Sequence, residues 1–428
     1  MRILIYILIL GQIAMATQIS KININNTEVP LIYELDRSLP IVSLQIVFRV
    51  SGSIEDNGSA GLAKLSASML SEGSKKRGSE GFANALESRA IHLSAHAGVE
   101  TLVIEVDSLK EEFSYALELL KELLQEPNLT PDSFTKVQTT TVGLLTRKLN
   151  DYDYVAKSNL RSLLFKDTPL ATQTSGTIQS IQSLKLSDVK EFLSKHLGIS
   201  SAFIVVGGDI ELDRLKKELQ TTLSVLPKLP PKVLPYFSVT ADEGNTTLVR
   251  KSEQAYLYFG SPYHIKVDDP EWYKSRVAMF ILGSSGFGSR LMEQIRVKRG
   301  LAYSAFSRAV VSNSSSYFYG YLQTKNESLD EALSVVVQTI SDFVRDGVTQ
   351  SELDQAKKFI LGSEPLRVET LSQRLSRTQD EYYRGRKLGD SRTELELIRS
   401  LTLDELNAFI KKHTEINSLA FSILKGEV

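Results

Sequence analysis

Histidine, a frequent ligand of catalytic zinc, occurs only five times in this chain of 428 residues. His92 and His96 have the i, i+4 spacing that places two rings on one face of a helix. The apolar pattern around them predicts a strand instead, on which residues four apart lie about 13 Å from each other. One metal ion cannot bind both rings at that separation, so we predict no metal site here.

The other three histidines indicate structural roles. His196 and His413 each end a predicted helix directly after a lysine, where a positive charge stabilises the negative end of the helix dipole. His264 lies in a predicted loop without a neighbouring ligand pattern, and we expect it at the surface.

Two short motifs match catalytic or phosphate-binding signatures only in part. The glycine-rich segment from Gly283 to Ser289 joins two predicted helical segments and lacks the Gly-Lys-Ser/Thr ending of a phosphate-binding loop. Ser133 and Lys136 have the Ser-x-x-Lys spacing of some acylating enzymes, but no supporting motif follows them. We predict neither phosphate binding nor acyl transfer at these segments.

The segment from Ser289 to Ser304 is the most informative part of the chain. Its apolar periodicity predicts a helix that Gly300 can end, followed by a strand that begins at Tyr303. Arg296 and Tyr303 can then project from adjoining elements. Each residue taken singly also fits a structural role, Arg296 as a solvated helix residue and Tyr303 as a core aromatic.

The elements that position these residues belong to a chain that repeats itself. Ile181–His196 and Ile398–His413 share seven identical residues in sixteen positions. An amphipathic helical run that starts at Phe113 recurs from Leu329 at nearly the same separation. Several matches in order, at nearly one separation, indicate that an α+β unit of roughly 200 residues has been duplicated.

Composition indicates where the two copies meet. Four prolines between Leu226 and Pro235 favour an extended, semi-rigid linker. We therefore predict three parts after the N-terminal segment: a first half at 17–226, a linker at 227–235 and a second half at 236–428.

Within each half, clusters of strands are interleaved with helices and do not alternate with them one by one. Examples of predicted strands are residues 42–50, 93–106 and 317–323. Thr130 and Thr349 each precede an acidic first turn, which predicts the N-caps of equivalent helices. This order favours an α+β fold in which each half is an antiparallel sheet with helices packed on one face.

The N-terminus has the composition of a secretory signal. Arg2 precedes the apolar run Ile3–Leu10, and Ala14-Met15-Ala16 provides a small-x-small cleavage site. We predict a signal peptide at 1–16. An uncleaved anchor is the alternative, although the run is shorter than the roughly 20 residues that span a bilayer. An exported chain without cysteine suits the periplasm of a Gram-negative bacterium.

Gross charge does not identify a partner. Lysine and arginine number 50 against 51 aspartates and glutamates, which leaves a net charge of −1. This balance predicts no basic face for nucleic acid. After the signal, no segment is apolar enough in sequence to predict a membrane span.

Around Arg296 the chain resembles the C-terminal half of the pitrilysin/insulinase-like zinc metallopeptidases, or inverzincins, particularly the mitochondrial-processing-peptidase branch. The segments that carry the resemblance are Asp268–Gly283, Ser289-Arg-Leu and Arg296-x-x-x-Gly300-Leu-Ala-Tyr303 in the second half, and Ala60–Ala63, Met69-Leu70, Glu72-Gly73 and Val206–Asp209 in the first. It covers essentially all of the chain after residue 16. The resemblance implies two homologous α+β halves in a clamshell arrangement, in agreement with the duplication.

The family uses an inverted zinc motif, His-x-x-Glu-His, with a further Glu downstream. Two imidazoles and a carboxylate hold the zinc, and the motif Glu acts as the base. In this chain Lys64 and Ser68 replace both histidines, and Ala67 replaces the base. The predicted helix at 135–149 contains no carboxylate, and Val137 is the best match to the missing ligand. We therefore predict that this chain binds no zinc and no other cofactor.

Arg296 and Tyr303 keep the separation of a pair that, in related peptidases, reaches from the second half to the substrate carbonyl beside the zinc. In the processing-peptidase branch, one subunit keeps the zinc motif while its partner supplies this pair. The resemblance implies a non-catalytic, substrate-binding subunit that is inactive alone. Its expected partners are a homologous, zinc-binding His-x-x-Glu-His subunit in a heterodimer, and an extended peptide added along a sheet edge.

Two other functions are compatible with the resemblance. The fold can persist as a scaffold, as in the core proteins of the respiratory complex, with Arg296 and Tyr303 as relics. The chain can also be an autonomous metalloendopeptidase with unrecognised ligands, which the positions of the five histidines disfavour.

Overall fold

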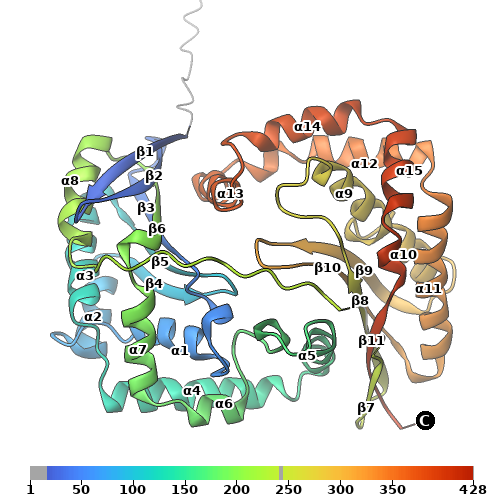
Figure 1. The fold of residues 1–428 in the computed structure, drawn as a ribbon, viewed down its shortest axis with the longest axis horizontal. Helices are drawn as coiled ribbons and strands as arrows, with labels where there is room; N and C mark the ends of the chain where they lie inside the picture. The colour runs from blue at the N-terminus through green and yellow to red at the C-terminus, as the bar shows by residue number, and fades with distance from the viewer. Residues whose placement is uncertain (1–16, 241–243, 428) are drawn as a thin grey trace, which may run out of the picture.

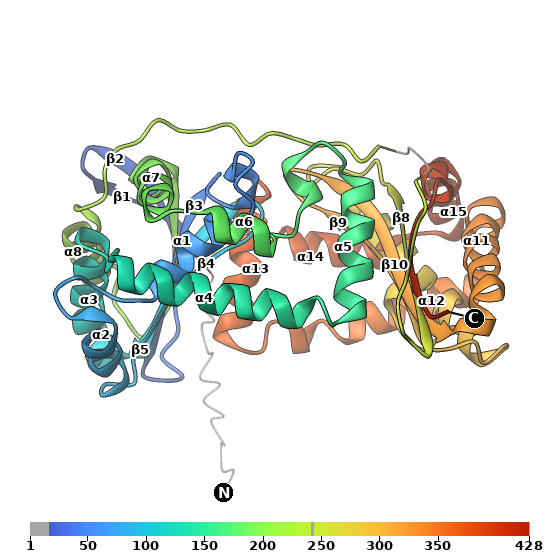
Figure 2. The same cartoon turned by 90° about the horizontal axis from the view of Figure 1, so that it is seen from below.

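The computed structural model describes residues 17–240 and 244–427, and Figure 1 shows two halves that each contain one sheet and its helices. The predicted signal at 1–16 lies outside the described residues. Between the halves, residues 227–240 contain neither helix nor strand and cross from one half to the other, as Figure 2 shows. The four prolines of this segment account for its extended course because each lacks a backbone N–H.

The first sheet has six strands in the order β1-β2-β6-β3-β5-β4. Their bounds are β1 (Gln18–Ile24), β2 (Thr27–Leu35), β3 (Ile41–Arg49), β4 (His92–Ala97), β5 (Thr101–Leu109) and β6 (Ala202–Gly208). The predicted strand at 93–106 is therefore wrong in its extent. The segment is a hairpin that turns at Gly98. The Gly98 N–H donates to the Thr101 carbonyl, and the Gly98 carbonyl accepts a hydrogen bond from the Ser53 N–H.

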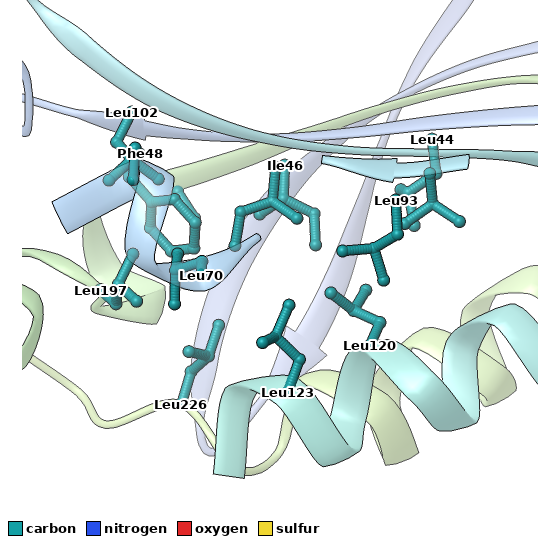
Figure 3. Packing of buried hydrophobic residues seen from close by; sticks show 14 of the residues in the cluster. Leu44, Ile46, Phe48, Leu70, Leu93, Leu102, Leu120, Leu123, Leu197 and Leu226 are labelled. Atoms are coloured by element: carbon teal, nitrogen blue, oxygen red, sulfur yellow. The ribbon is translucent and has the colours of Figure 1, made fainter. Parts of the chain in front are cut away.

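Apart from α5, the helices of the first half pack their apolar sides on one face of this sheet. The helices of the first half are α1 (Leu62–Leu70), α2 (Gly78–Glu87), α3 (Phe113–Gln125), α4 (Pro131–Lys148), α5 (Tyr152–Leu164), α6 (Ile178–Ser183), α7 (Leu186–His196) and α8 (Leu212–Leu223). Figure 3 shows Ile46 of β3 pointing toward Leu123 of α3 across this core, and Phe48 of β3 beside Leu70 of α1. Thr130 caps α4 as predicted, by accepting a hydrogen bond from the Ser133 backbone.

The second sheet has five strands in the order β7-β11-β8-β10-β9. Their bounds are β7 (Thr246–Val249), β8 (Gln254–Pro262), β9 (Ala302–Val311), β10 (Ser316–Lys325) and β11 (Ala420–Lys425). Its helices are α9 (Trp272–Met279), α10 (Arg290–Met292), α11 (Leu329–Asp346), α12 (Gln350–Gly362), α13 (Leu371–Tyr383), α14 (Asp390–Ser400) and α15 (Leu403–Lys412). Thr349 caps α12, as the sequence predicts.

The predicted class, α+β with two homologous halves, is confirmed, and the sheets add one detail. Each sheet is antiparallel except for one parallel pair, β2 with β6 and β7 with β11. In both pairs a strand from the start of the half lies beside the strand that ends it. The intervening helices return the last strand in the same direction as the first, as a parallel pairing requires.

Each half also contributes one helix to the free face of the other sheet. Leu375 of α13 lies in a cluster with Phe203 and Val205 of the first sheet, and Leu164 of α5 lies in a cluster with Tyr258 of the second. Figure 1 shows α13 beside the first sheet and α5 beside the second. The prediction of helices on one face of each sheet therefore holds for a half taken by itself. The other face of each sheet is covered by a helix from the other half.

Two strand glycines permit this close approach. A Cβ atom at Gly207 of β6 would lie 2.9 Å from side-chain atoms of Leu371 and Leu375 in α13. A Cβ atom at Gly260 of β8 would lie 2.8 Å from Leu164 Cδ1 in α5. Glycine in a strand interior often marks such an approach. The two sheets thus use the same device to receive a helix.

None of the helices within 17–240 and 244–427 has both the length and the apolar character needed to cross a membrane.

Candidate functional site

Arg296 and Tyr303 lie side by side at the start of β9. Arg296 belongs to a π-helical turn, Glu293–Val297, that continues α10, and Gly300 then reverses the chain with φ of +64°. The Arg296 Cζ atom lies 4.3 Å from the centroid of the Tyr303 ring and 4.6 Å from that of Phe287. The guanidinium is thus held between two aromatic rings, an arrangement worth about 0.5–1 kcal/mol at an exposed site.

Both aromatic rings beside Arg296 are open to solvent. Tyr303 is 82% exposed and Phe287 is 69% exposed, so the alternative of Tyr303 as a core aromatic is wrong. No ion pair of Arg296 and no hydrogen bond of the Tyr303 hydroxyl to a side chain occurs in the described part of the chain. The guanidinium and the phenol therefore retain donors for a ligand.

A β-bulge determines the direction of Tyr303. Ala305 pairs with Leu322 and Ala302 pairs with Thr324, with a register shift between them. Both alanines face the helices of the second core, so Tyr303 and Ser304 occupy the space that strict alternation gives to one residue. The extra residue turns Tyr303 toward the other face of the sheet, because a bulge changes side-chain direction. The sequence predicts the strand here but not the bulge.

That other face of the second sheet is rich in tyrosine, and we call it the tyrosine face. Its members alternate along β8, β9 and β10: Tyr256, Tyr258, Phe306, Tyr317, Tyr319 and Tyr321. Tyr258 and Tyr321 stack with ring centroids 5.0 Å apart. The Tyr258 hydroxyl donates to Asp153 Oδ1 of α5 over 2.8 Å, and burial followed by this bond raises the pKa of Tyr258.

No single motif in the sequence marks the tyrosine face. Its signal in the sequence is tyrosine at every second position, at 256 and 258 and again at 317, 319 and 321. Side chains two apart on a strand share a face. Tyrosine combines a flat apolar ring with a polar hydroxyl, and here the rings pack against α5 of the first half, with Tyr258 and Tyr319 buried.

The degenerate motif lies on α1. Lys64 is exposed, Ala67 is buried in the first core, and the Ser68 hydroxyl donates to the Lys64 carbonyl over 3.0 Å. Desolvation of the ammonium, and then the charge of Lys148, lower the pKa of Lys64. Lys148 ends α4, and its Nζ atom lies 5.1 Å from the Tyr154 ring centroid. Two lysines therefore occupy the corner to which the resemblance assigns zinc.

Val137 lies on the buried side of α4. It is 7% exposed and lies in the hydrophobic core between α4 and the first sheet. Lys148, whose charge helps to lower the pKa of Lys64, lies about 16 Å from Val137 along the axis of α4. The correspondence of Val137 to the missing ligand stays a prediction.

The residues of this corner do not fit zinc. Lysine carries a positive charge, alanine has no donor atom, and α4 contributes no carboxylate between 135 and 148. Across 17–240 and 244–427, no group of three or more His, Asp or Glu side chains is placed to hold a metal ion.

The strand β4 provides an unpaired main-chain edge next to α1. It forms one end of the first sheet and, among the strands of 17–240 and 244–427, pairs only with β5. His92 and His96 both lie on this strand, as predicted, and both are exposed. An edge strand of this kind can add a peptide as a further strand.

The remaining histidines have structural roles. His264 is exposed, as predicted, and His413 ends α15 with its Nδ1 atom 2.7 Å from Glu415 Oε1. His196 is buried with Nδ1 3.1 Å from the Val50 carbonyl. Burial, then the charge of Lys232, lower the pKa of His196, so its ring is neutral near pH 7. The predicted positive charge of His196 at the helix end is therefore wrong.

The weak motifs also have structural roles. The Ser133 hydroxyl donates to the Asn128 carbonyl over 2.6 Å and takes part in the cap of α4. Lys136 pairs with Glu72 over 2.9 Å. Gly283 of the glycine-rich segment packs against Ser307 of β9.

Comparisons with known proteins agree with this architecture. The model described as Insulinase (Peptidase family M16) matches residues 32–178, and the one described as Peptidase M16 inactive domain matches residues 183–360. The Helicobacter pylori protein named non-peptidase homolog YmxG is 42% identical over 412 residues, which cover 96% of this chain and 95% of that protein. A Rickettsia bellii protein named uncharacterized zinc protease is 23% identical over 74% of this chain and 76% of its own.

A solved structure shows the same fold. The crystal structure of a peptidase M16 inactive domain from Pseudomonas fluorescens has a TM-score of 0.88 at 23% identity, and covers 96% of this chain and 98% of that one. With both family models matched in order and a relative at 42% identity, the chain belongs to the insulinase family of peptidases, as a member without the family's His-x-x-Glu-His motif.

Proposed function

We propose that this chain is a non-catalytic, peptide-binding subunit that contributes Arg296 and Tyr303 to the active site of a homologous partner. The partner carries His-x-x-Glu-His and the zinc ion. The observation that supports this most is the arrangement of the pair itself. A guanidinium and a phenol lie together, exposed, on a bulge that turns Tyr303 toward the tyrosine face.

The chemistry of the pair fits a supporting role. Donors aimed at a developing oxyanion lower the barrier by roughly 3 kcal/mol each, but they do not activate water. Activation needs a base or a metal ion, and the corner of Lys64, Ala67 and Ser68 offers neither. Arg296 and Tyr303 can therefore assist hydrolysis only beside a site that supplies both.

One further surface supports peptide binding. The free edge of β4 offers main-chain donors and acceptors in the first half. Main-chain pairing along such an edge gives an extended peptide its affinity.

Export to the periplasm of a Gram-negative bacterium is part of this proposal. It rests on the signal-like composition of residues 1–16 and on the absence of cysteine from the whole chain. Fractionation of cells that produce the tagged full chain, with mass spectrometry of the mature N-terminus, tests both export and cleavage after Ala16.

Reconstitution with a His-x-x-Glu-His homologue tests the main claim. The isolated chain should contain no stoichiometric zinc and cleave no peptide, and activity should require both subunits. Arg296→Ala and Tyr303→Phe should each lower kcat by about 10²-fold, as loss of an oxyanion donor does. Arg299→Ala is the matched control, because Arg299 lies on the same segment and, within the described residues, its side chain bonds only to Gln294. Full activity of the isolated chain contradicts the proposal.

A scaffolding protein is the second candidate, and the contacts between the halves favour it. Arg374 of the second half pairs with Glu34 and Asp36 of the first, and Glu100 of the first half accepts two hydrogen bonds from Ser314 of the second. Such contacts suit a rigid body. If the double variant Arg296→Ala/Tyr303→Phe assembles and leaves the complex fully active, the scaffold is the better description.

A further inference from the structure

A pocket of about 260 Å³ lies between the two halves, away from the Arg296–Tyr303 pair. The first half contributes the turn between β4 and β5 and the C-terminal part of α5, and the second contributes the turn between β9 and β10. Val310 lines the pocket near the end of β9, whereas Tyr303 lies at its start, about 23 Å away along an extended strand. The pocket is therefore a separate site.

Arg161 of α5 provides the positive charge of this pocket. Its Nε atom donates to the Leu170 carbonyl over 2.5 Å, and its Cζ atom lies 5.8 Å from the centroid of the Phe165 ring. The residue is half-buried, and this burial lowers the pKa of Arg161. In the described ranges no carboxylate lies within 4.0 Å of this guanidinium, in contrast to the paired Arg374.

The acidic residue that lines the pocket is already occupied. Glu100 is buried, and its Oε1 atom accepts from the Ser314 backbone over 2.8 Å and from the Ser314 hydroxyl over 2.6 Å. These bonds join the two halves at the rim of the pocket. The Glu100 carboxylate is thus hydrogen-bonded to Ser314 and forms no ion pair with Arg161 within the described residues.

Arg161 is half-buried in the wall of the pocket, so its guanidinium has lost part of its hydration and has gained no anion in exchange. With Nε bound to Leu170, the two terminal nitrogens of Arg161 remain as a fork that matches a carboxylate. Beside it, Phe165, Leu170 and Val310 form an apolar wall. The volume is below the range of roughly 300–1,000 Å³ typical of cofactor and drug-sized ligands.

We propose that this pocket binds a carboxylate carried on a small apolar group. The carboxylate contacts the terminal nitrogens of Arg161, and the apolar group packs against Phe165, Leu170 and Val310. A free branched-chain acid and the C-terminal residue of a peptide both have this chemistry. The inference does not depend on the proposed role of Arg296 and Tyr303.

Titration of the full-length chain, followed by calorimetry and thermal unfolding, tests the proposal. The first probe pair is 4-methylpentanoate and its amide, and the second is a pentapeptide that ends in leucine with either a free or an amidated C-terminus. We expect a Kd of about 1 mM for the small acid, given its few heavy atoms, and binding at least tenfold weaker for the amide. Binding of the free-ended peptide alone identifies a peptide C-terminus as the source, and binding of the small acid identifies a free acid.

Two variants complete the test. Arg161→Met should abolish binding of every carboxylate probe, whereas Arg367→Met, which removes an exposed arginine, should leave it unchanged. If Arg161→Met fails to fold, Val310→Phe retains the guanidinium, fills the pocket and should also abolish binding. Equal binding of acid and amide, unchanged binding by both pocket variants, or no saturable binding of any probe up to about 20 mM would overturn the proposal.

Discussion

Arg374 of α13 and Glu34 of β2 join the two halves of the protein through a direct ion pair. The Arg374 Nε atom donates to Glu34 Oε1 over 2.6 Å, and the same guanidinium also pairs with Asp36. Glu34 is buried, so this contact replaces water that the carboxylate would otherwise bind. The pair lies where α13 of the second half covers the free face of the first sheet.

We expect Arg374→Met to weaken the contact between the halves. Removal of the guanidinium leaves the buried Glu34 carboxylate without its partner, at a cost of about 1–3 kcal/mol in the free energy of unfolding. Urea unfolding measures this change, and limited proteolysis between 227 and 240 reports loosening of the halves. Arg367→Met removes the same charge from an exposed position and should change neither quantity. Equal stability of the two variants contradicts this prediction.

Gly260→Ala should also destabilise the protein, because the added methyl group has no space. Its Cβ atom would lie 2.8 Å from Leu164 Cδ1 and 2.9 Å from the Phe318 carbonyl. Overpacking of this kind costs about 1–3 kcal/mol. Gly143→Ala is the matched control, because no described residue across from α4 lies within 4 Å of its Cβ position and alanine favours a helix. Thermal unfolding should therefore show a lower Tm for the first variant and an unchanged or higher Tm for the second.

Asp56 should make the stability of the first half depend on pH. Its carboxylate accepts from the Gly61 and Ala63 backbone at the start of α1, and burial raises the pKa of Asp56 to about 7 in spite of these bonds. In the unfolded chain the pKa of an aspartate is about 4. Between these two values the folded protein holds a proton that the unfolded chain releases, so the free energy of unfolding falls as pH rises from about 4 to 7.

Asp56→Asn tests this dependence, because an amide does not titrate. Urea unfolding at several pH values should show a smaller decrease between about pH 4 and 7 for the variant than for the unchanged protein. The variant should also be less stable, since one of the two backbone N–H groups loses its acceptor. Identical slopes of stability against pH in the two proteins would show that Asp56 ionises at its ordinary pKa.

Restoring a zinc site should require a ligand on the exposed side of α4. The charge of Lys148 contributes to lowering the pKa of Lys64, which indicates that the two side chains lie near each other. Leu144 lies one turn before Lys148 on α4 and is 47% exposed. Side chains four apart on a helix share a face. We therefore expect the triple variant Lys64→His, Ser68→His, Leu144→Glu to bind zinc in about a 1:1 ratio, measured by atomic emission after dialysis.

The control for this design places the carboxylate at the position that the sequence suggests. Val137→Glu in the same background should bind no zinc and should be less stable by several kcal/mol, roughly the cost of burying an unpaired carboxylate. If the Val137→Glu variant binds zinc and the Leu144→Glu variant does not, the side of α4 that faces Lys64 and Ser68 is the side of Val137, and this prediction is wrong.

The sequence by itself determined the features that depend on residue types and local spacing. The duplication, the N-caps at Thr130 and Thr349, and the strand at His92 and His96 follow from identity and periodicity over a few residues. The loss of the zinc ligands is likewise a statement about composition at Lys64, Ala67 and Ser68. These conclusions need no knowledge of what lies across the core.

The tertiary structure decided the features that depend on contacts between distant residues. The bulge at Tyr303 follows from the register of β9 on β10, and the neutral state of His196 follows from burial next to Lys232. The unpaired charge of Arg161 becomes visible only when α5 lies on the sheet of the other half. In each case the direction, charge or exposure of a side chain is set by neighbours that local sequence patterns do not specify.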